Sequence, residues 1–214
     1  INKTPVTMLM NFTSFDGLTD VTHLGIFGLA AFSNIPNLLV LSPSSAEEYI
    51  SMLDWSLEQR ENPVLILIPG NQVTHRPADK SYDDINSFKI EEKGEKVAVI
   101  ALGDFFQKGQ ELAAAIKEKC GFTPSLINPR FASGIDKEML SSLEKDHQLV
   151  ITLEDGILEG GFGQKIASFY GGSKMLVKNY GLEKKFYDRY NPAELLSDCG
   201  MTTEQIVKEL KSLL

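Results

Sequence analysis

Short, wholly apolar runs alternate along the chain with segments whose apolar residues recur at helical spacing. Val64–Ile68 is apolar at every position, which is typical of a parallel strand covered on both faces. Such strands separated by helices predict an α/β fold, in which helices cover parallel sheets through right-handed crossovers. The predicted strands are residues 5–10, 38–41, 64–68, 97–102, 125–127, 149–153 and 175–177.

The segments between these runs predict helices, and one of them has a clear start signal. Either Ser44 with Glu47 or Ser45 with Glu48 forms the capping-box pattern, which satisfies backbone donors at a helix start. The predicted helices are residues 25–32, 105–119, 136–145 and 163–170, with two more that follow residues 45 and 202.

A change in composition divides this pattern into two parts. Between residues 71 and 96 apolar residues become sparse, and charged residues gather towards the end of the stretch. Such a stretch is typical of a boundary between domains. We therefore expect a first domain at residues 1–78, a linker at 79–96 and a second domain at 97–214.

Composition and charge exclude several classes of protein. Hydrophobic residues make up 43% of the 214 residues and charged residues 23%, which excludes a disordered or collagen-like chain. Acidic residues outnumber basic ones 29 to 21, and the net charge of -8 argues against a nucleic-acid partner. Cys120 and Cys199 lack metal-binding spacing and fit a reducing cytoplasm. No apolar run approaches the roughly 20 residues of a membrane span, so no membrane partner is expected.

The segment 11–23 holds most of the candidate chemistry. It follows a predicted strand, at the end where open α/β sheets place their ligands, and it contains His23, Asp16, Asp20 and Thr22. An imidazole that titrates near neutral pH can donate to a substrate oxygen or carry a proton. The alternative is structural, with Thr22 and His23 capping a helix that starts near Gly25.

Two other segments have structural interpretations. The glycines within residues 160–163 precede a helix, but their spacing does not match a phosphate-binding motif, and Glu154 and Asp155 would repel an anion. Close packing of the helix on the sheet is the favoured interpretation. The pair His75 and Arg76 lies in the polar stretch and is expected to be solvated surface.

Several motifs occur in a set order. They are T-H-x-G-x-F at 22–27, I-P-N at 35–37, P-S at 43–44, N-P-R-F at 128–131, I-D at 135–136, V-I-T-L-E-D at 150–155 and G-G-F-G at 160–163. In this order they resemble the motifs of the transketolase superfamily, and most of all its 1-deoxy-D-xylulose-5-phosphate synthase family. The resemblance covers nearly the whole chain.

The resemblance implies a fold, cofactors, a reaction and site residues. Members of the family use thiamine diphosphate and Mg²⁺ to join a two-carbon unit from pyruvate to glyceraldehyde 3-phosphate, a step that feeds isoprenoid biosynthesis. Residues 1–78 would be the latter half of the pyrimidine-binding domain and residues 97–214 the transketolase-like carboxyl-terminal domain. The family implies that His23 is catalytic, that Asp20 and Thr22 bind substrate, and that the protein is a cytoplasmic homodimer.

The family's groups for holding the cofactor are expected outside this chain. Its G-D-G…N motif for metal and diphosphate does not occur, and its glutamate that activates the aminopyrimidine would lie before Ile1. The resemblance therefore implies two kinds of partner: small-molecule substrates, and an upstream thiamine-diphosphate-binding domain, either in a longer chain or in a separate subunit.

The chain departs from the family where the acceptor's phosphate is bound. Phe12 stands in place of an arginine, Thr19 in place of an aspartate with Asp20 one position later, and residues 67–70 replace an R-Y-P-R-G motif. Guanidinium groups are the natural partners of a phosphate dianion. Two alternatives follow: a transketolase-like enzyme with an unphosphorylated acceptor, or a non-catalytic paralogue that serves assembly.

Overall fold

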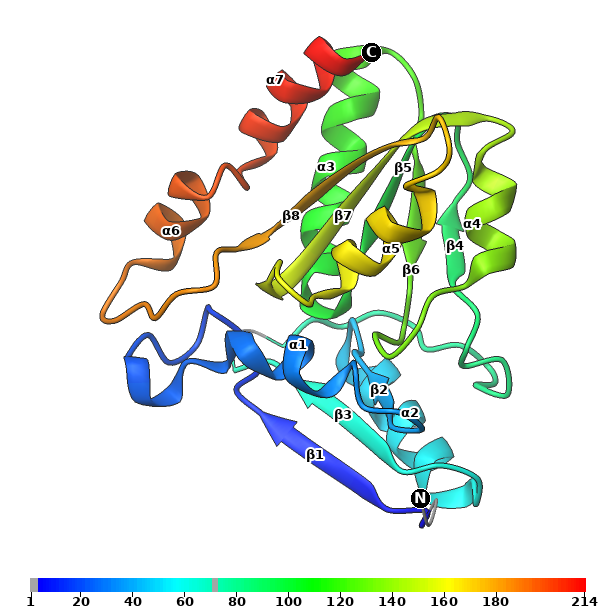
Figure 1. Cartoon of the computed structure of the whole chain (residues 1–214), viewed down its shortest axis with the longest axis vertical. Helices are drawn as coiled ribbons and strands as arrows, with labels where there is room; N and C mark the ends of the chain where they lie inside the picture. Colours follow the sequence, from blue (N-terminus) through cyan, green and yellow to red (C-terminus); the bar gives the residue numbers. More distant parts are fainter. Residues whose placement is uncertain (1–3, 71–72) are drawn as a thin grey trace.

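Two sheets meet in this protein and share a core at their junction (Figure 1). The computed structural model describes residues 4–70 and 73–214. Strands and helices alternate as the hydrophobic pattern predicts, and the strand pairs in the described residues are parallel except at one edge. The predicted α/β fold class is confirmed.

The first half of the chain forms a three-stranded parallel sheet. Its elements are β1 (Thr7–Asn11), the 3-10 turns η1 (Val21–His23) and η2 (Gly25–Phe27), α1 (Gly28–Phe32), β2 (Leu39–Leu41), α2 (Ala46–Glu58) and β3 (Val64–Ile68). The strand order is β1-β3-β2, so β1 lies at an edge. Helix α2 packs on β1 and β3, and the Thr7 hydroxyl donates to the Ser56 hydroxyl at 3.0 Å.

The second half forms a five-stranded sheet in the order β4-β6-β5-β7-β8, in which only β4 is antiparallel to its neighbour in the described residues. Its strands are β4 (Lys89–Glu92), β5 (Lys96–Ala101), β6 (Ser125–Asn128), β7 (His147–Ile157) and β8 (Leu176–Leu182). Its helical elements are the turn η3 (Gly103–Phe105), α3 (Phe106–Cys120), α4 (Lys137–Leu143), α5 (Phe162–Tyr170), α6 (Pro192–Asp198) and α7 (Thr203–Leu213).

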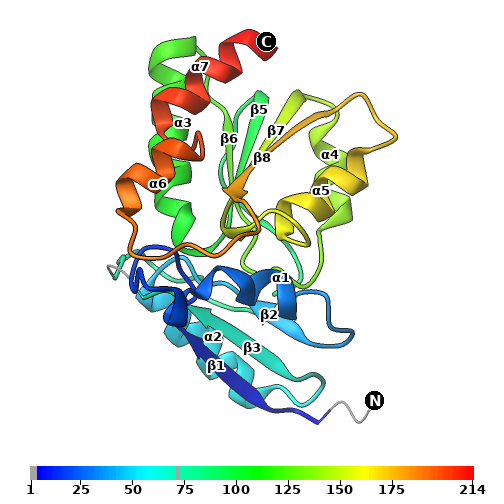
Figure 2. The ribbon, with the colours of Figure 1, turned by 60° about the vertical axis from the view of Figure 1, so that its left-hand side comes forward.

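Side-chain alternation along β5 explains why helices cover both faces of this sheet. Val97 and Val99 join the core formed with α3 and α7, whereas Ala98 and Ile100 join the core formed with α4 and α5. Figure 2 shows α3, α6 and α7 on one side of the sheet and α4 and α5 on the other. Among the described residues, no helix combines the length and apolar character that a bilayer crossing requires.

The carboxyl ends of strands from both sheets converge at the junction. The Ser42 N–H donates to the Arg130 carbonyl at 2.9 Å, and the Ala132 N–H donates to the Val40 carbonyl at 2.8 Å, so the end of β2 lies against the segment after β6. The lining of a small cavity there includes residues at or just beyond the carboxyl ends of β1, β2, β3, β5 and β7. Ligands of α/β proteins bind at such strand ends, so the junction positions the candidate site.

The segment expected as a linker, residues 79–96, contributes to the second half of the fold. It contains the edge strand β4, and its side chains Tyr82, Ile85 and Phe88 are buried in the core. The buried guanidinium of Arg130 fixes this segment by donating to the Ser87 carbonyl at 3.1 Å and by pairing with Asp84 at 3.2 Å. The low apolar content reflects an edge strand and a few core contacts, and the domain boundaries stay a prediction.

Helix starts agree with the sequence patterns in most but not all details. The Ser45 hydroxyl accepts from the Glu48 N–H at 3.1 Å, as predicted, but the Glu48 carboxylate accepts from the N–H of Ser44 at 2.7 Å instead of closing the box on Ser45. The helix predicted at residues 25–32 is split into η2 and the short α1. Helix α6 was not predicted from the sequence.

Candidate functional site

The loop after β1 carries the three residues that the sequence singled out, and a local hydrogen bond shapes it. Asp20 precedes η1, and its carboxylate accepts from the Thr22 N–H at 3.1 Å. Leu24, which precedes η2, forms no side-chain cap. The interpretation that Thr22 and His23 cap a helix near Gly25 is therefore wrong, because Asp20 caps the turn to which both belong.

Thr22 and His23 both contact one carboxylate oxygen of Asp20. The Nδ1 atom of His23 lies 3.1 Å from Asp20 Oδ1 and 2.8 Å from the Thr22 hydroxyl, which itself donates to the same Asp20 oxygen. The hydrogen bond from the Thr22 hydroxyl, followed by the contact with His23, lowers the pKa of Asp20 to about 2. Asp20 is therefore an anion at neutral pH, beside an exposed imidazole.

This arrangement orients an imidazole for proton transfer. An N–H on Nδ1 that donates to Asp20 fixes the ring and its tautomer, and leaves Nε2 to meet a substrate. An imidazole held in this way can accept a proton as a neutral ring or donate one as an imidazolium.

A close backbone contact explains the path of this loop. Phe12 has a φ of 57°, in the left-handed region, and turns the chain directly after β1. A Cβ atom on Gly25 would lie 1.7 Å from the Phe12 carbonyl oxygen, so only glycine allows η2 to pass so near. The loop therefore leaves β1 and doubles back on itself, so that Gly25, two residues after His23, lies against the strand end.

A cavity of about 570 Å³ opens between this loop and the start of α3. Its walls include Asp16 and Gly17 from the loop and three charged residues of the second half, Asp104, Lys108 and Glu111. Three carboxyl groups thus face one ammonium group. An anionic ligand gains little in such surroundings.

The glycine-rich turn before α5 is used for packing, which confirms the interpretation of residues 160–163. A Cβ atom on Gly163 would lie 2.4 Å from the Thr152 hydroxyl oxygen, so glycine allows α5 to approach the sheet. The donors at the start of α5 are already occupied, because the buried Glu154 carboxylate accepts from the N–H groups of Phe162 at 2.7 Å and Gly163 at 2.8 Å. A phosphate group has no place there.

The described residues do not fit thiamine diphosphate or Mg²⁺. No three His, Cys, Asp or Glu side chains in residues 4–70 and 73–214 are grouped so that they could hold a metal ion. The glycine-rich start of α5 is filled by the chain's own Glu154. No reaction step through the cofactor is therefore assigned to this chain's residues.

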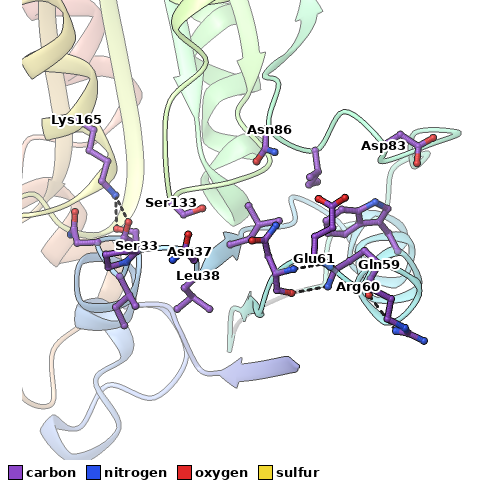
Figure 3. A pocket seen from close by; sticks show the side chains of 17 residues that line it. Ser33, Asn37, Leu38, Gln59, Arg60, Glu61, Asp83, Asn86, Ser133 and Lys165 are labelled. Carbon is purple, nitrogen blue, oxygen red and sulfur yellow. Dashed lines mark hydrogen bonds between the residues drawn. The ribbon is translucent and has the colours of Figure 1, made fainter. Parts of the chain in front are cut away.

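A second cavity, of about 700 Å³, lies at the opposite end of the first sheet (Figure 3). It is lined by the loops that precede β2 and β3, whereas the His23 loop follows β1. Burial lowers the pKa of Lys165 to about 8. Its ammonium donates to the Ser33 hydroxyl at 2.7 Å and to the Ala132 carbonyl at 2.9 Å, so Lys165 ties the two halves together.

The pair His75 and Arg76 differs from its expected role. His75 is exposed and lies 2.8 Å from a Glu47 oxygen, as a solvated residue would. Arg76 is largely buried: its guanidinium pairs with Glu91 at 2.5 Å and stacks over the Phe106 ring. The interpretation of Arg76 as solvated surface is wrong, because its charge is matched at the junction between the halves.

Sequence reasoning missed the residues that hold the His23 loop from the second half. Phe15 of the loop contacts Asp155 and Tyr190, which lie 140 and 175 positions further along the chain. The position of Asp155 at the carboxyl end of a buried strand was a usable signal for Asp155. No local pattern marks Tyr190.

The fold and this loop define an α/β protein of two joined sheets with a histidine–aspartate pair at a strand end. The family model described as "Transketolase, C-terminal domain" matches residues 87–206. The chain therefore belongs to the transketolase family, and residues 87–206 correspond to its C-terminal domain.

Relatives of known name extend this similarity to the whole chain. The chain is 30% identical over 217 aligned residues to a 1-deoxy-D-xylulose-5-phosphate synthase of Clostridium tetani, covering 100% of this chain and 35% of the relative. A synthase of the same name from Shouchella clausii is 27% identical and covers 92% of this chain and 32% of the relative. The chain thus spans about a third of the length of these relatives, and its resemblance to a carboxyl-terminal portion is confirmed.

Solved structures share the fold. A structure titled "Split gene transketolase, inactive beta4 tetramer" superposes with a TM-score of 0.83 at 22% identity, and covers 97% of this chain and 66% of that chain. A transketolase from Campylobacter jejuni gives a TM-score of 0.71 at 19% identity, covering 96% of this chain and 31% of that chain.

Proposed function

We propose that this chain is part of a thiamine-diphosphate-dependent transferase that joins a two-carbon unit from pyruvate to an aldehyde, as the resemblance of its motifs to the synthase family implies. The observation that carries the proposal is the cluster of Asp20, Thr22 and His23 at the carboxyl end of β1. It lies in a chain that aligns over its full length with the Clostridium tetani synthase.

The roles within this cluster follow from its hydrogen bonds. His23 donates or accepts a proton at a substrate oxygen through Nε2, because Nδ1 is held by Asp20. Asp20 orients the ring and stabilises its protonated form, as the buried aspartate does in a catalytic triad. Thr22 keeps the Asp20 carboxylate in place and offers its hydroxyl to the substrate.

An upstream partner supplies the cofactor site in this proposal. The edge strand β1 pairs only with β3 in the described residues. Its Met8 and Leu9, and Val6 just before it, are exposed, although parallel sheets are normally covered. We infer that an upstream segment, or a separate subunit, covers this edge, and that the complete protein is a homodimer. The split-gene structure, described by its title as inactive, supports the dependence on a further chain.

Calorimetry with thiamine diphosphate and Mg²⁺ tests this proposal. The complete protein, with its upstream domain or subunit, is expected to bind the cofactor and to form a ketose product from pyruvate and an aldehyde. Residues 1–214 alone are expected to show no measurable binding, because they lack a metal site in their described part.

Two outcomes would contradict the proposal in different ways. Micromolar binding by residues 1–214 alone would mean that the cofactor site lies within this chain. A complete protein that binds cofactor with substrates present but forms no product would favour the non-catalytic alternative.

The acceptor is expected to be recognised with little help from a phosphate group. The cavity beside the loop presents Lys108 as its one basic side chain in the described residues, against three carboxyl groups, and Phe12 occupies an arginine position of the family. A charge-assisted contact contributes about 1.5–3 kcal/mol, so the loss of two costs on the order of 10²- to 10⁴-fold in preference for a phosphorylated acceptor.

A competition assay measures this preference. The complete protein is given glyceraldehyde and glyceraldehyde 3-phosphate together, and the two products are quantified. Similar kcat/KM values support an unphosphorylated acceptor. A strong preference for the phosphorylated aldehyde would show that basic groups outside this chain replace the missing arginines.

A further inference from the structure

The loop that carries His23 is fastened to the second half of the chain at its first turn. The N–H of Phe15 donates to Asp155 Oδ1 at 3.0 Å, and the Tyr190 hydroxyl donates to the carbonyl of the same Phe15. The Phe15 ring is buried and packs edge-on against Phe105, with 5.9 Å between the ring centroids. Both backbone groups of one loop residue are therefore satisfied by side chains of the other half.

A second attachment brackets Asp20 itself. The Arg189 N–H donates to the Thr19 carbonyl at 2.7 Å, and the Val21 N–H donates to the Asp188 carboxylate at 3.1 Å. Thr19 and Val21 are the two neighbours of Asp20, so the carboxylate that holds His23 lies between two fixed backbone groups. The segment 188–190 thus contacts the loop at three positions.

The contact between Asp155 and Phe15 lies in the interior of the protein. Its side chain is buried at the end of β7, and burial together with the nearby charge of Asp104 raises the pKa of its carboxyl well above the usual range. Placing a carboxyl group in such surroundings costs free energy. Its hydrogen bond to the Phe15 N–H satisfies a buried backbone donor that would otherwise be unpaired.

We propose that Asp155, Tyr190, the Asp188 carboxylate and the backbone N–H of Arg189 hold the loop of residues 13–23 in position, so that the second half of the chain fixes where His23 stands. This inference rests on the proposed function for its catalytic consequence. A displacement of about 1 Å can cost about 10²-fold in rate, so a domain that offers no reacting group still controls turnover.

Tyr190→Phe tests the attachment with the least disturbance, because it removes one hydroxyl and keeps the ring. In the complete protein we expect backbone hydrogen exchange of residues 13–23 to rise by about fivefold or more, the scale of one hydrogen bond. Turnover is expected to fall by a similar factor with little change in KM. Tyr170→Phe is the matched control, since its hydroxyl also donates to a carbonyl, that of Leu140 at 2.6 Å, away from the loop.

Asp155 provides a second, independent test. Asp155→Asn keeps an oxygen acceptor for the Phe15 N–H and is expected to leave exchange near the wild-type rate, whereas Asp155→Ala removes the acceptor and is expected to raise it. This rescue by the conservative variant distinguishes a specific hydrogen bond from general destabilisation.

The outcomes separate this inference from the proposed function. Unchanged loop exchange in Tyr190→Phe, or equal exchange in the Tyr170→Phe control, would overturn the attachment. Faster exchange with unchanged turnover would overturn the positioning role. Faster exchange in a protein whose wild type makes no product would leave the attachment standing and refute the proposed function alone.

Discussion

Replacing His23 with alanine in the complete protein is expected to lower turnover by about 10²-fold or more, the usual scale for a positioned proton donor or acceptor. The reason is geometric: Asp20 holds Nδ1 at 3.1 Å and leaves Nε2 for a substrate oxygen. His23→Asn is expected to recover part of this loss, because an amide can donate a hydrogen bond but cannot titrate. Steady-state rates of the two variants measure the effect.

Stability separates a catalytic from a structural role for His23. Its side chain is 57% exposed, so neither variant is expected to shift the melting temperature by more than about a degree. His75→Ala is the matched control, because His75 forms the same kind of exposed contact, 2.8 Å from a Glu47 oxygen and away from the loop. Normal turnover in His23→Ala, or an equal loss in His75→Ala, would contradict the catalytic role.

The buried strands could be predicted because each of them requires an unbroken run of apolar residues in the sequence. The run predicted at residues 64–68 coincides with β3, and the predicted 97–102 differs by one residue from β5. Strands covered on both faces need apolar residues at every position, and few other structures have this requirement.

Elements at the edge of the fold have a weaker apolar pattern in the sequence. Strand β4 contains Lys89, Glu91 and Glu92, because an edge strand is partly solvated and charge there discourages pairing with other chains. The short helix α6 buries only Leu195 among its seven residues, so its apolar pattern is too sparse to recognise. A low density of apolar residues is therefore a poor indicator of a linker.

The candidate site divides in the same way between local and distant contacts. Asp20, Thr22 and His23 lie within four positions, so a sequence pattern could place them together, and the structure does so. The contacts of Phe15 with Asp155 and Tyr190 join segments from different halves of the chain. Only the fold can bring such residues together, and no local spacing reports it.

Glu154 shows how a residue can be noticed for the wrong reason. The sequence predicts that its charge repels a phosphate group at the glycine-rich turn, but in the structure its carboxyl group itself occupies the position that a phosphate would fill. It accepts from the Phe162 and Gly163 N–H groups. Gly161 is needed for the same contact, since a Cβ atom there would lie 2.4 Å from Glu154 Oε2. The turn is thus built around an internal hydrogen-bond acceptor, the carboxyl group of Glu154.

The stability of this protein is expected to fall between about pH 4.5 and pH 7 because of Glu154. Burial raises the pKa of Glu154 from 4.5 to about 7, against the opposing effect of its two backbone donors and Lys165. In that window the folded state binds more protons than the unfolded state, so the free energy of unfolding decreases as the pH rises. A shift of this size corresponds to about 3 kcal/mol.

Glu154→Gln removes this titration and tests its origin. At pH 5 the wild-type carboxyl is protonated in the folded state, and its hydroxyl oxygen can still accept from an N–H, whereas the amide NH₂ group of the variant can only donate. The variant is therefore expected to be less stable by about 1–3 kcal/mol at this pH. Because the stability of the variant no longer declines through Glu154, its stability relative to the wild type is expected to rise by about 2 kcal/mol or more by pH 8, which cancels or reverses the deficit at pH 5. Denaturant unfolding at a series of pH values measures both quantities.

Glu204→Gln, an exposed first-turn substitution in α7, is the control and is expected to leave the pH dependence unchanged. Parallel curves for Glu154→Gln and the wild type would mean that the N–H donors of α5 outweigh burial and that Glu154 ionises normally in the folded protein.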